Sequence, residues 1–442
     1  MPGVLFLTLS AATPASSVFV IMPGMLQAAG SGALWAMALA GLVCVATAFV
    51  YAELSSAWPI AGGEYVMVAR TLGPLAGFVV LGVNVFNNIL FPPVVALGTA
   101  TVLATVLPGV PQLPVAVAVM LFSTLFAVLD IKMNALVTGL FLAVELAALA
   151  LVSALGFGGG VHAIGALVAV PLMPSGRGLV PATPAAIGIA TTIAIFALNG
   201  YGMAVYFGEE MKDASTEIAR VILLSLALTL AAEAIPLAAL LVGAPDLHTL
   251  FAAADPFGGY ARAAGGTTLA SWLAGGVVIA IVNAAIVTIL ACARFFYASG
   301  RDRTWGRPLD AFLAAIHPRF ESPWAATLLI GAVGIACCFV NLTFLLVLSG
   351  AGLVVTYAAI SLAAIVGRRT GATAHGAYRM PLFPLAPVIA LAALAYVAWT
   401  SWLDPEEGRP GLIATGVQMA AAAAYYWLVV RRRGAWRTHD PA

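Results

Sequence analysis

The sequence predicts an all-α membrane protein with twelve transmembrane helices. Of its 442 residues, 62% are hydrophobic and only 8% are charged, whereas a soluble domain carries about 25% charged residues. Twelve apolar stretches come close to the roughly 20 residues that span a bilayer. With both termini in the cytoplasm, all Lys and Arg residues except Arg177, Arg262 and Arg409 lie on the cytoplasmic side, as the positive-inside rule requires.

The twelve predicted helices follow one another along most of the chain. The first begins without the basic region and cleavage site of a signal peptide, so we expect no cleaved signal. The third is long enough to tilt or to extend beyond the bilayer. The predicted helix cores are residues 4–28, 33–53, 75–106, 113–129, 134–157, 184–208, 218–243, 268–297, 324–341, 344–366, 381–403 and 410–430.

Four segments between these helices carry some structure of their own. Residues 55–73 are too polar to span a membrane, and they break at Pro and Gly residues before a short amphipathic piece. Residues 299–323 mix charges with an apolar run, which is typical of a short interfacial helix. The Gly-rich and Pro-rich segments 158–183 and 244–267 are expected to cover the outer face, the second with a small helix in residues 254–266.

Two of the predicted helices are interrupted. Residues 4–28 are broken by Pro14-Ala15-Ser16-Ser17 and again by Pro23-Gly24, and residues 184–210 are broken by Asn199-Gly200-Tyr201-Gly202. Backbone that leaves the helix at membrane depth is tolerated only where it is buried in protein or lines a wet cavity. Two such segments, each opening one half of the chain, indicate the substrate site of an inverted-repeat transporter.

Composition and motifs argue against other classes of function. The chain has no phosphate-binding G-x-x-x-x-G-K-[ST] motif and no His, Cys, Asp and Glu cluster with metal-ligand spacing. Its five histidines fall in loops or the tail, and its four cysteines fall in apolar runs. We therefore expect no enzyme activity, no catalytic residue, no cofactor and no metal. The net charge of +1 gives no reason to expect a nucleic-acid partner.

Four stretches in order along the chain resemble the amino acid–polyamine–organocation superfamily of permeases. They are Ala15-Ser16-Ser17-Val18-Phe19 with Pro23-Gly24, then Tyr51-Ala52-Glu53-Leu54 with Ala61-Gly62-Gly63-Glu64-Tyr65, then Phe196 to Gly200 with Glu209-Glu210-Met211-Lys212, and Ala293 to Asp302 with His317-Pro318-Arg319-Phe320. The resemblance implies a leucine-transporter-like fold with a five-plus-five inverted repeat and broken helices 1 and 6. The repeats would be residues 1–157 and 184–367, followed by two extra helices in 381–430 and a cytoplasmic tail, 431–442.

The two breaks are the candidate substrate site. Broken helices expose backbone N–H and C=O groups that can hold the carboxylate and the ammonium of an amino acid, and small side chains let the substrate come close. The alternative is that Pro14 and the Gly residues only kink packed helices. In the family an aromatic at the place of Phe196 often lies over the substrate, although lipid or core packing is also open. The candidate substrate-binding residues are Ala15, Ser16, Ser17, Val18, Phe196, Ala197, Asn199 and Gly200.

Two acids fall well inside predicted helices, Glu145 in the fifth and Glu233 in the seventh. Such residues are costly in a bilayer, so they usually face the bundle and serve a function. In the implied fold Glu145 packs near the first break, which makes it the first candidate for proton coupling. A protonated Glu bonded to a neighbouring helix is the alternative. For Glu233 a structural role is favoured, because a carbonyl freed by Pro236 could be its partner.

Departures from the family pattern bear on substrate and coupling. The family often has an acid two places after the glycine of the second break, but here that place is Gly202, which favours a neutral amino acid over an amine. The fifth helix lacks the lysine of many proton-coupled relatives, which puts that coupling mechanism in doubt. For sodium, the eighth helix offers Asn283 and Thr288 without an adjacent Ser/Thr pair. A cytoplasmic gate is expected among Glu53, Glu64, Glu209, Glu210, Lys212 and Arg294, with a solvated loop face as the alternative.

The sequence thus predicts a secondary active transporter of amino acids, neutral ones foremost, in the inner or plasma membrane. Its partners would be a small-molecule substrate, a proton more readily than sodium, and the lipid bilayer. Symport and exchange are both open, and the protein could be a monomer or a homodimer. The first alternative is a transporter of polyamines or other organic amines. A non-transporting membrane sensor or a complex subunit ranks lower.

Overall fold

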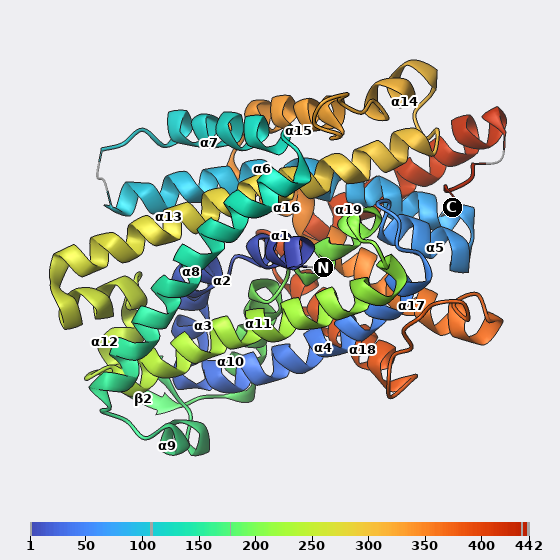
Figure 1. Ribbon diagram of the computed structural model, residues 1–442. Coiled ribbons are helices and arrows are strands. Elements are labelled where there is room, and N and C mark those ends of the chain that lie inside the picture. Colours follow the sequence, from blue (N-terminus) through green and yellow to red (C-terminus); the bar gives the residue numbers. More distant parts are fainter. Residues whose placement is uncertain (1, 107–108, 177, 435, 440–442) are drawn as a thin grey trace.

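A computed structural model describes residues 2–106, 109–176, 178–434 and 436–439. Almost all of them are helical (Figure 1). In these ranges nine helices are long and apolar enough to cross a membrane, and α7 (Gln112–Ala127) and α15 (Trp324–Cys337) are shorter apolar helices. The molecule is therefore an all-α, multi-pass membrane protein as predicted. The number of twelve spans stays a prediction, and Arg177 lies outside the described residues.

The first helix is interrupted where the sequence predicts its first break. Helix α1 ends at Ala12, and Thr13 takes a left-handed conformation with φ 41° before Pro14 opens the next short helix. A π-helical turn, η1, then leads into α3, which contains Pro23 in its first turn. The predicted second break at Pro23-Gly24 is wrong, because the missing N–H of a proline is tolerated in the first turn of a helix.

The second break brings the two halves of the chain together. Helix α10 ends at Ala197, and a 3-10 helix, η3, begins at Tyr201 after Gly200, whose φ is 123°. A Cβ atom on Gly200 would lie 2.5 Å from the Cα atom of Ala12. The ends of the two broken helices are therefore in contact. The inverted-repeat symmetry itself stays a prediction.

The broken first helix lies in the middle of the bundle (Figure 1). On one side of it α6 and α13 pack against each other, with α7 and α15 against both; on the other side lie α4, α10 and α11. Helix α1 contacts α8, α11, α13 and η3. The bounds are α1 Pro2–Ala12, α2 Pro14–Ser16, η1 Ser17–Ile21, α3 Met22–Ala29, η2 Gly30–Gly32, α4 Ala33–Ala57, α5 Glu64–Leu72, α6 Pro74–Val106, α8 Ile131–Gly159, α10 Pro184–Ala197, η3 Tyr201–Glu210, α11 Ala214–Gly243, α13 Pro256–Arg301, α16 Leu342–Gly350, α17 Gly352–Thr370, α18 Leu385–Leu403, α19 Gly408–Tyr425, η4 Tyr426–Val430 and η5 Arg431–Arg433.

The connecting segments are more structured than the sequence indicates. The segment 158–183 contains α9 (Ile164–Ala169) and an antiparallel hairpin of β1 (Leu172–Ser175) and β2 (Gly178–Pro181). In the segment 244–267 the stretch expected to be a small helix, 254–266, is helical from Pro256 and continues into α13 across a kink at Gly266. A further short helix, α12 (Leu247–Ala252), precedes it. The short helix expected within 299–323 is present as α14 (Arg307–Leu313). The predicted helix 344–366 is divided into α16 and α17 at Ala351.

Candidate functional site

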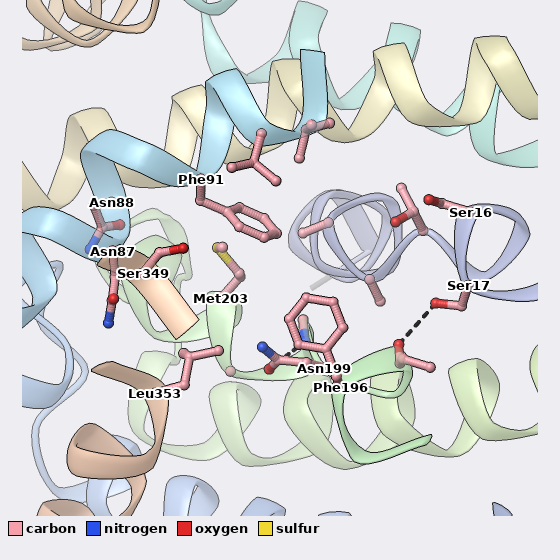
Figure 2. Close-up of a pocket in the computed structure, with 18 of the residues that line it drawn as sticks. Ser16, Ser17, Asn87, Asn88, Phe91, Phe196, Asn199, Met203, Ser349 and Leu353 are labelled. Carbon is pink, nitrogen blue, oxygen red and sulfur yellow. Dashed lines mark hydrogen bonds between the residues drawn. The ribbon is translucent and has the colours of Figure 1, made fainter. Parts of the chain in front are cut away.

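A cavity of about 330 Å³ lies where the two broken helices meet. Its wall is formed by both breaks together with residues of α6, η3, α16 and α17 (Figure 2). Apolar side chains, among them Phe91, Met203 and Leu353, line the part of the cavity between its two ends. Ser16 and Ser17 lie at one end in Figure 2, and Asn87, Asn88 and Ser349 lie at the opposite end. A mostly apolar cavity with polar groups at its two ends is typical of a small-molecule binding site.

The first end of the cavity is built from the helix breaks. Six of the eight candidate substrate-binding residues line it: Ser16, Ser17, Phe196, Ala197, Asn199 and Gly200. The other two, Ala15 and Val18, are fully buried and are absent from the wall. The Ser17 hydroxyl donates a hydrogen bond of 2.9 Å to the carbonyl oxygen of Ala197, so the two breaks are bonded to each other at this point.

Asn199 holds the unwound segment of the second break. Its Oδ1 atom accepts a hydrogen bond of 2.8 Å from the backbone N–H of Gly200. The same atom accepts from the hydroxyl of Tyr357 on α17. Of the two roles that the sequence leaves open for Asn199, this geometry favours support of the loop, since both contacts are made by the protein itself.

The opposite end of the cavity is a cluster of amides on α6. Asn84, Asn87 and Asn88 all line the wall. The amide nitrogen of Asn88 donates to the carbonyl oxygen of Asn84 at 2.8 Å, and the hydroxyl of Thr356 on α17 donates to Asn84 Oδ1 at 2.7 Å. The cluster therefore joins α6 to α17 while it faces the cavity.

Glu64 reaches the wall at this amide end, although the sequence places it among the cytoplasmic gate residues. Its carboxylate accepts hydrogen bonds from Tyr51 Oη at 2.9 Å, Tyr206 Oη at 2.8 Å and Asn84 Nδ2 at 3.4 Å. The residue is 5% exposed. Burial raises the pKa of Glu64, and the hydrogen bonds from Tyr206 and Tyr51 oppose that shift. In the described part of the chain no Lys, Arg or His forms an ion pair with it.

Sequence reasoning missed the tyrosines of the cavity wall, two of which bond to Glu64. Tyr51, Tyr206 and Tyr357 line the cavity, and none was singled out from the sequence as a site residue. For Glu64 itself the sequence contained a signal, the pair Gly62-Gly63. Gly63 has φ 59° and directly precedes α5, of which Glu64 is the first residue. This turn directs Glu64 inward, whereas an acid in a polar segment is ordinarily expected to face solvent.

Glu145 and Glu233 lie behind the first break, away from the cavity wall. Oε1 of Glu145 accepts a hydrogen bond of 2.8 Å from the backbone N–H of Ala15. Among the described residues its other oxygen and both oxygens of Glu233 have no hydrogen-bond partner. The carbonyl contact expected for Glu233 is therefore not made. The two carboxyl groups are close enough to interact electrostatically, and both are fully buried.

The remaining gate candidates form separate pairs. Arg294 binds Glu210 at 2.8 Å, Arg301 binds Glu209 at 2.8 Å and Arg368 binds Glu53 at 2.7 Å. Arg301 and Arg368 were not among the candidates, and Lys212 is exposed. These pairs connect η3 with α13, and α4 with α17, at the end of the molecule that contains α5 and the chain's C-terminal segment (Figure 1).

The polar residues of α13 that were weighed for sodium donate hydrogen bonds to the protein. Asn283 Nδ2 donates to Ser10 Oγ at 2.9 Å, and Thr288 Oγ1 donates to the carbonyl of Ala285 at 3.1 Å. Oδ1 of Asn283, the atom of this side chain that could bind a cation, is buried and has no partner among the described residues. Within the ranges that the structure describes, no group of three or more His, Cys, Asp or Glu could hold a metal ion.

Comparisons with known proteins give one family match and several related transporters. The family profile described as amino acid permease matches residues 2–429. An uncharacterized transporter of Mycobacterium tuberculosis is 30% identical over 72% of this chain and 68% of its own length. The methylthioribose transporter of Bacillus subtilis is 26% identical over 83% of this chain and 80% of its own. A low-affinity putrescine importer of Escherichia coli is 23% identical over 75% of this chain and 72% of its own.

Proposed function

Because the chain belongs to the amino acid permease family, we propose that it carries small amino acids across the inner or plasma membrane by alternating access. The observation that supports this most is the cavity at the junction of two broken helices. The half-helix ends at such breaks have favourable dipoles for a carboxylate and an ammonium on one carbon. The small side chains of Ser16 and Ser17 leave room for this contact.

Glu145 is our candidate for proton coupling. Its carboxyl group is bonded to the N–H of Ala15, inside the segment that separates α1 from the rest of the broken helix. An ionised carboxylate accepts this bond strongly, and a protonated one accepts it weakly. Loading and release of a proton would therefore alter how firmly the first break is held.

Uptake into proteoliposomes tests the function and the proton role together. The measurement uses a labelled panel of amino acids and polyamines with an imposed inward proton gradient. Glu145→Gln keeps a carbonyl acceptor for the N–H of Ala15 but cannot titrate. Glu406→Gln changes an exposed acid near the start of α19 and is the matched control. We expect the proton gradient to drive uptake of amino acids in the wild type and in the control. In Glu145→Gln we expect a rate of uptake that does not depend on the gradient.

Each other outcome removes a defined part of the proposal. Unchanged coupling in Glu145→Gln would remove Glu145 from the mechanism and leave transport in place. Accumulation of amines alone would replace the amino acid by the second candidate, a polyamine or another organic amine. That candidate is favoured by Glu64, an acid on the cavity wall. The preference for a neutral substrate rested on the absence of an acid from the two breaks, and Glu64 enters the cavity from a different element.

A further inference from the structure

The amide end of the cavity contains more hydrogen-bond acceptors than donors. The hydroxyls of Tyr51 and Tyr206 are directed at Glu64, and the hydroxyl of Thr356 is directed at Asn84. The amide of Asn87 also donates within the cluster, to Asn84 Oδ1 at 3.5 Å. Its own Oδ1 is buried and, among the described residues, has no partner. This end of the cavity therefore holds a carboxylate and a buried carbonyl oxygen without a partner.

The charge at this end is also unbalanced. Three other acids near the same face of the molecule, Glu53, Glu209 and Glu210, each bind an arginine. Glu64 is more buried than Glu209 and Glu210, yet its partners in the described structure are neutral hydroxyls and one amide. A buried carboxylate without a cation is costly. A cationic group in the cavity would offset that cost.

Aromatic rings surround this carboxylate. Tyr51, Tyr206 and Tyr357 line the cavity beside Glu64, and the rings of Tyr51 and Tyr357 meet edge to face with centroids 5.7 Å apart. A Cβ atom on Gly202 would lie 3.1 Å from the ring of Tyr51, so the backbone of the second break packs against this cluster.

We propose that Glu64, Asn87 and the surrounding tyrosines form a binding site for an ammonium group, so that the substrate carries a cation at the end remote from the helix breaks. The assignment rests on the proposed function only in treating this cavity as the substrate site. An ammonium group has three donors and no acceptor, which matches the free acceptors here. A carboxylate would face Glu64 and would find few free donors.

Equilibrium binding to the purified full-length protein tests the site with probes that differ in one group. The probes are 1,4-diaminobutane, 4-amino-1-butanol and butane-1,4-diol, which share a four-carbon chain. We expect the diamine to bind at least tenfold more tightly than the amino alcohol. In Glu64→Gln the diamine should lose that advantage over the amino alcohol. Glu406→Gln should behave as the wild type.

Three results would overturn the assignment: equal affinity for diamine and amino alcohol in the wild type, tightest binding of the diol, or an undiminished preference in Glu64→Gln. If Glu64→Gln does not fold, Asn87→Ala and the charge-retaining Glu64→Asp replace it. Asn87→Ala should weaken diamine binding selectively, and Glu64→Asp should retain a preference for the diamine; the opposite results would overturn the site. Proton-driven uptake of amino acids without any diamine preference would refute this site alone. Glu64-dependent diamine binding without transport of any panel member would refute the proposed function alone.

Discussion

At the scale of single residues, Gly200 shows why the second break needs glycine. Its φ of 123° lies in a region that other residues reach only with strain. An added Cβ would also lie 2.5 Å from Ala12 of the other broken helix. The position therefore combines an unusual backbone conformation with a close approach between the two halves of the chain, and both depend on the missing side chain.

We predict that Gly200→Ala lowers both the melting temperature in detergent and the rate of uptake. The backbone strain alone costs about 1–3 kcal/mol, and the contact with Ala12 adds to it. Gly275→Ala is the control, because a Cβ there meets nothing within 4 Å. A thermal unfolding curve and an uptake assay for each variant provide the measurement. A Gly200→Ala protein as stable and as active as Gly275→Ala would contradict this account of the break.

A second prediction at this scale is the pH dependence of diamine binding. Because burial raises the pKa of Glu64, its carboxylate takes up a proton at a higher pH than an exposed Glu does. The groups that face it are Tyr51 from α4, Tyr206 from η3 and Asn84 from α6. None of these is charged in the acidic range, and an amine with a pKa near 10 stays charged throughout.

Diamine affinity should therefore fall as the pH is lowered, while in Glu64→Gln it should be flat. Isothermal titration of 1,4-diaminobutane at a series of pH values measures this. The amino alcohol serves as the reference ligand, since general acid damage to the protein would weaken both probes. An equal fall for both probes, or a slope that persists in Glu64→Gln, would assign the effect to another group.

The location of Glu145 could be predicted from the sequence, whereas that of Glu64 could not. An acid within an apolar helix stands out in the sequence, and the structure places Glu145 beside the first break. Glu64 lies in a polar segment where a solvated acid is the ordinary expectation, and its inward direction depends on the turn at Gly63. The tyrosines that bond to it come from segments 13 and 142 positions away. Such long-range contacts leave no local pattern.

At the scale of elements, the structure differs from the sequence prediction mainly where turns decide the outcome. Residues with helix-breaking tendencies mark both interruptions, but Pro23 is accommodated in the first turn of α3. The β1–β2 hairpin has strands of four residues each, too short to give a clear alternating pattern. The long apolar helices could be predicted without knowledge of the turns, because an apolar stretch long enough to span a bilayer identifies each of them.

The contact between α4 and α17 provides a prediction for elements. Glu53 on α4 is 1% exposed, and Arg368 on α17 binds both of its oxygens at 2.7 Å. Removal of the arginine leaves a buried carboxylate without its cation, a change that costs on the order of 3 kcal/mol. Arg368→Gln should therefore lower the melting temperature clearly. Its neighbour Arg369 is exposed, so Arg369→Gln should have little effect.

The double variant Glu53→Gln with Arg368→Gln separates the pair from general damage. It removes the uncompensated charge, so it should recover part of the lost stability. The three variants and the wild type are compared by thermal unfolding in one detergent. A double variant no more stable than Arg368→Gln would show that the loss arises elsewhere, for example in the contact of Arg368 with the carbonyl of Met380.

At the scale of the whole molecule, the uneven distribution of basic residues predicts the orientation of the chain. With twelve spans and both termini in the cytoplasm, Gly165 in α9 is outside, and Thr370 and Arg432 are inside. All three positions are exposed, and a Cβ on Gly165 meets no atom within 4 Å. Five predicted helices separate Gly165 from Thr370, and two separate Thr370 from Arg432. Their sidedness therefore depends directly on the helix count.

Labelling of single cysteines in intact cells tests this orientation. The four native cysteines are first replaced by alanine, and Gly165→Cys, Thr370→Cys and Arg432→Cys are then made one at a time. A membrane-impermeant maleimide should modify only Gly165→Cys in intact cells and all three after permeabilisation. Labelling of Thr370→Cys and Arg432→Cys from opposite sides would require an odd number of spans after α17. The basic tail would then lie outside, against the charge rule on which the orientation rests.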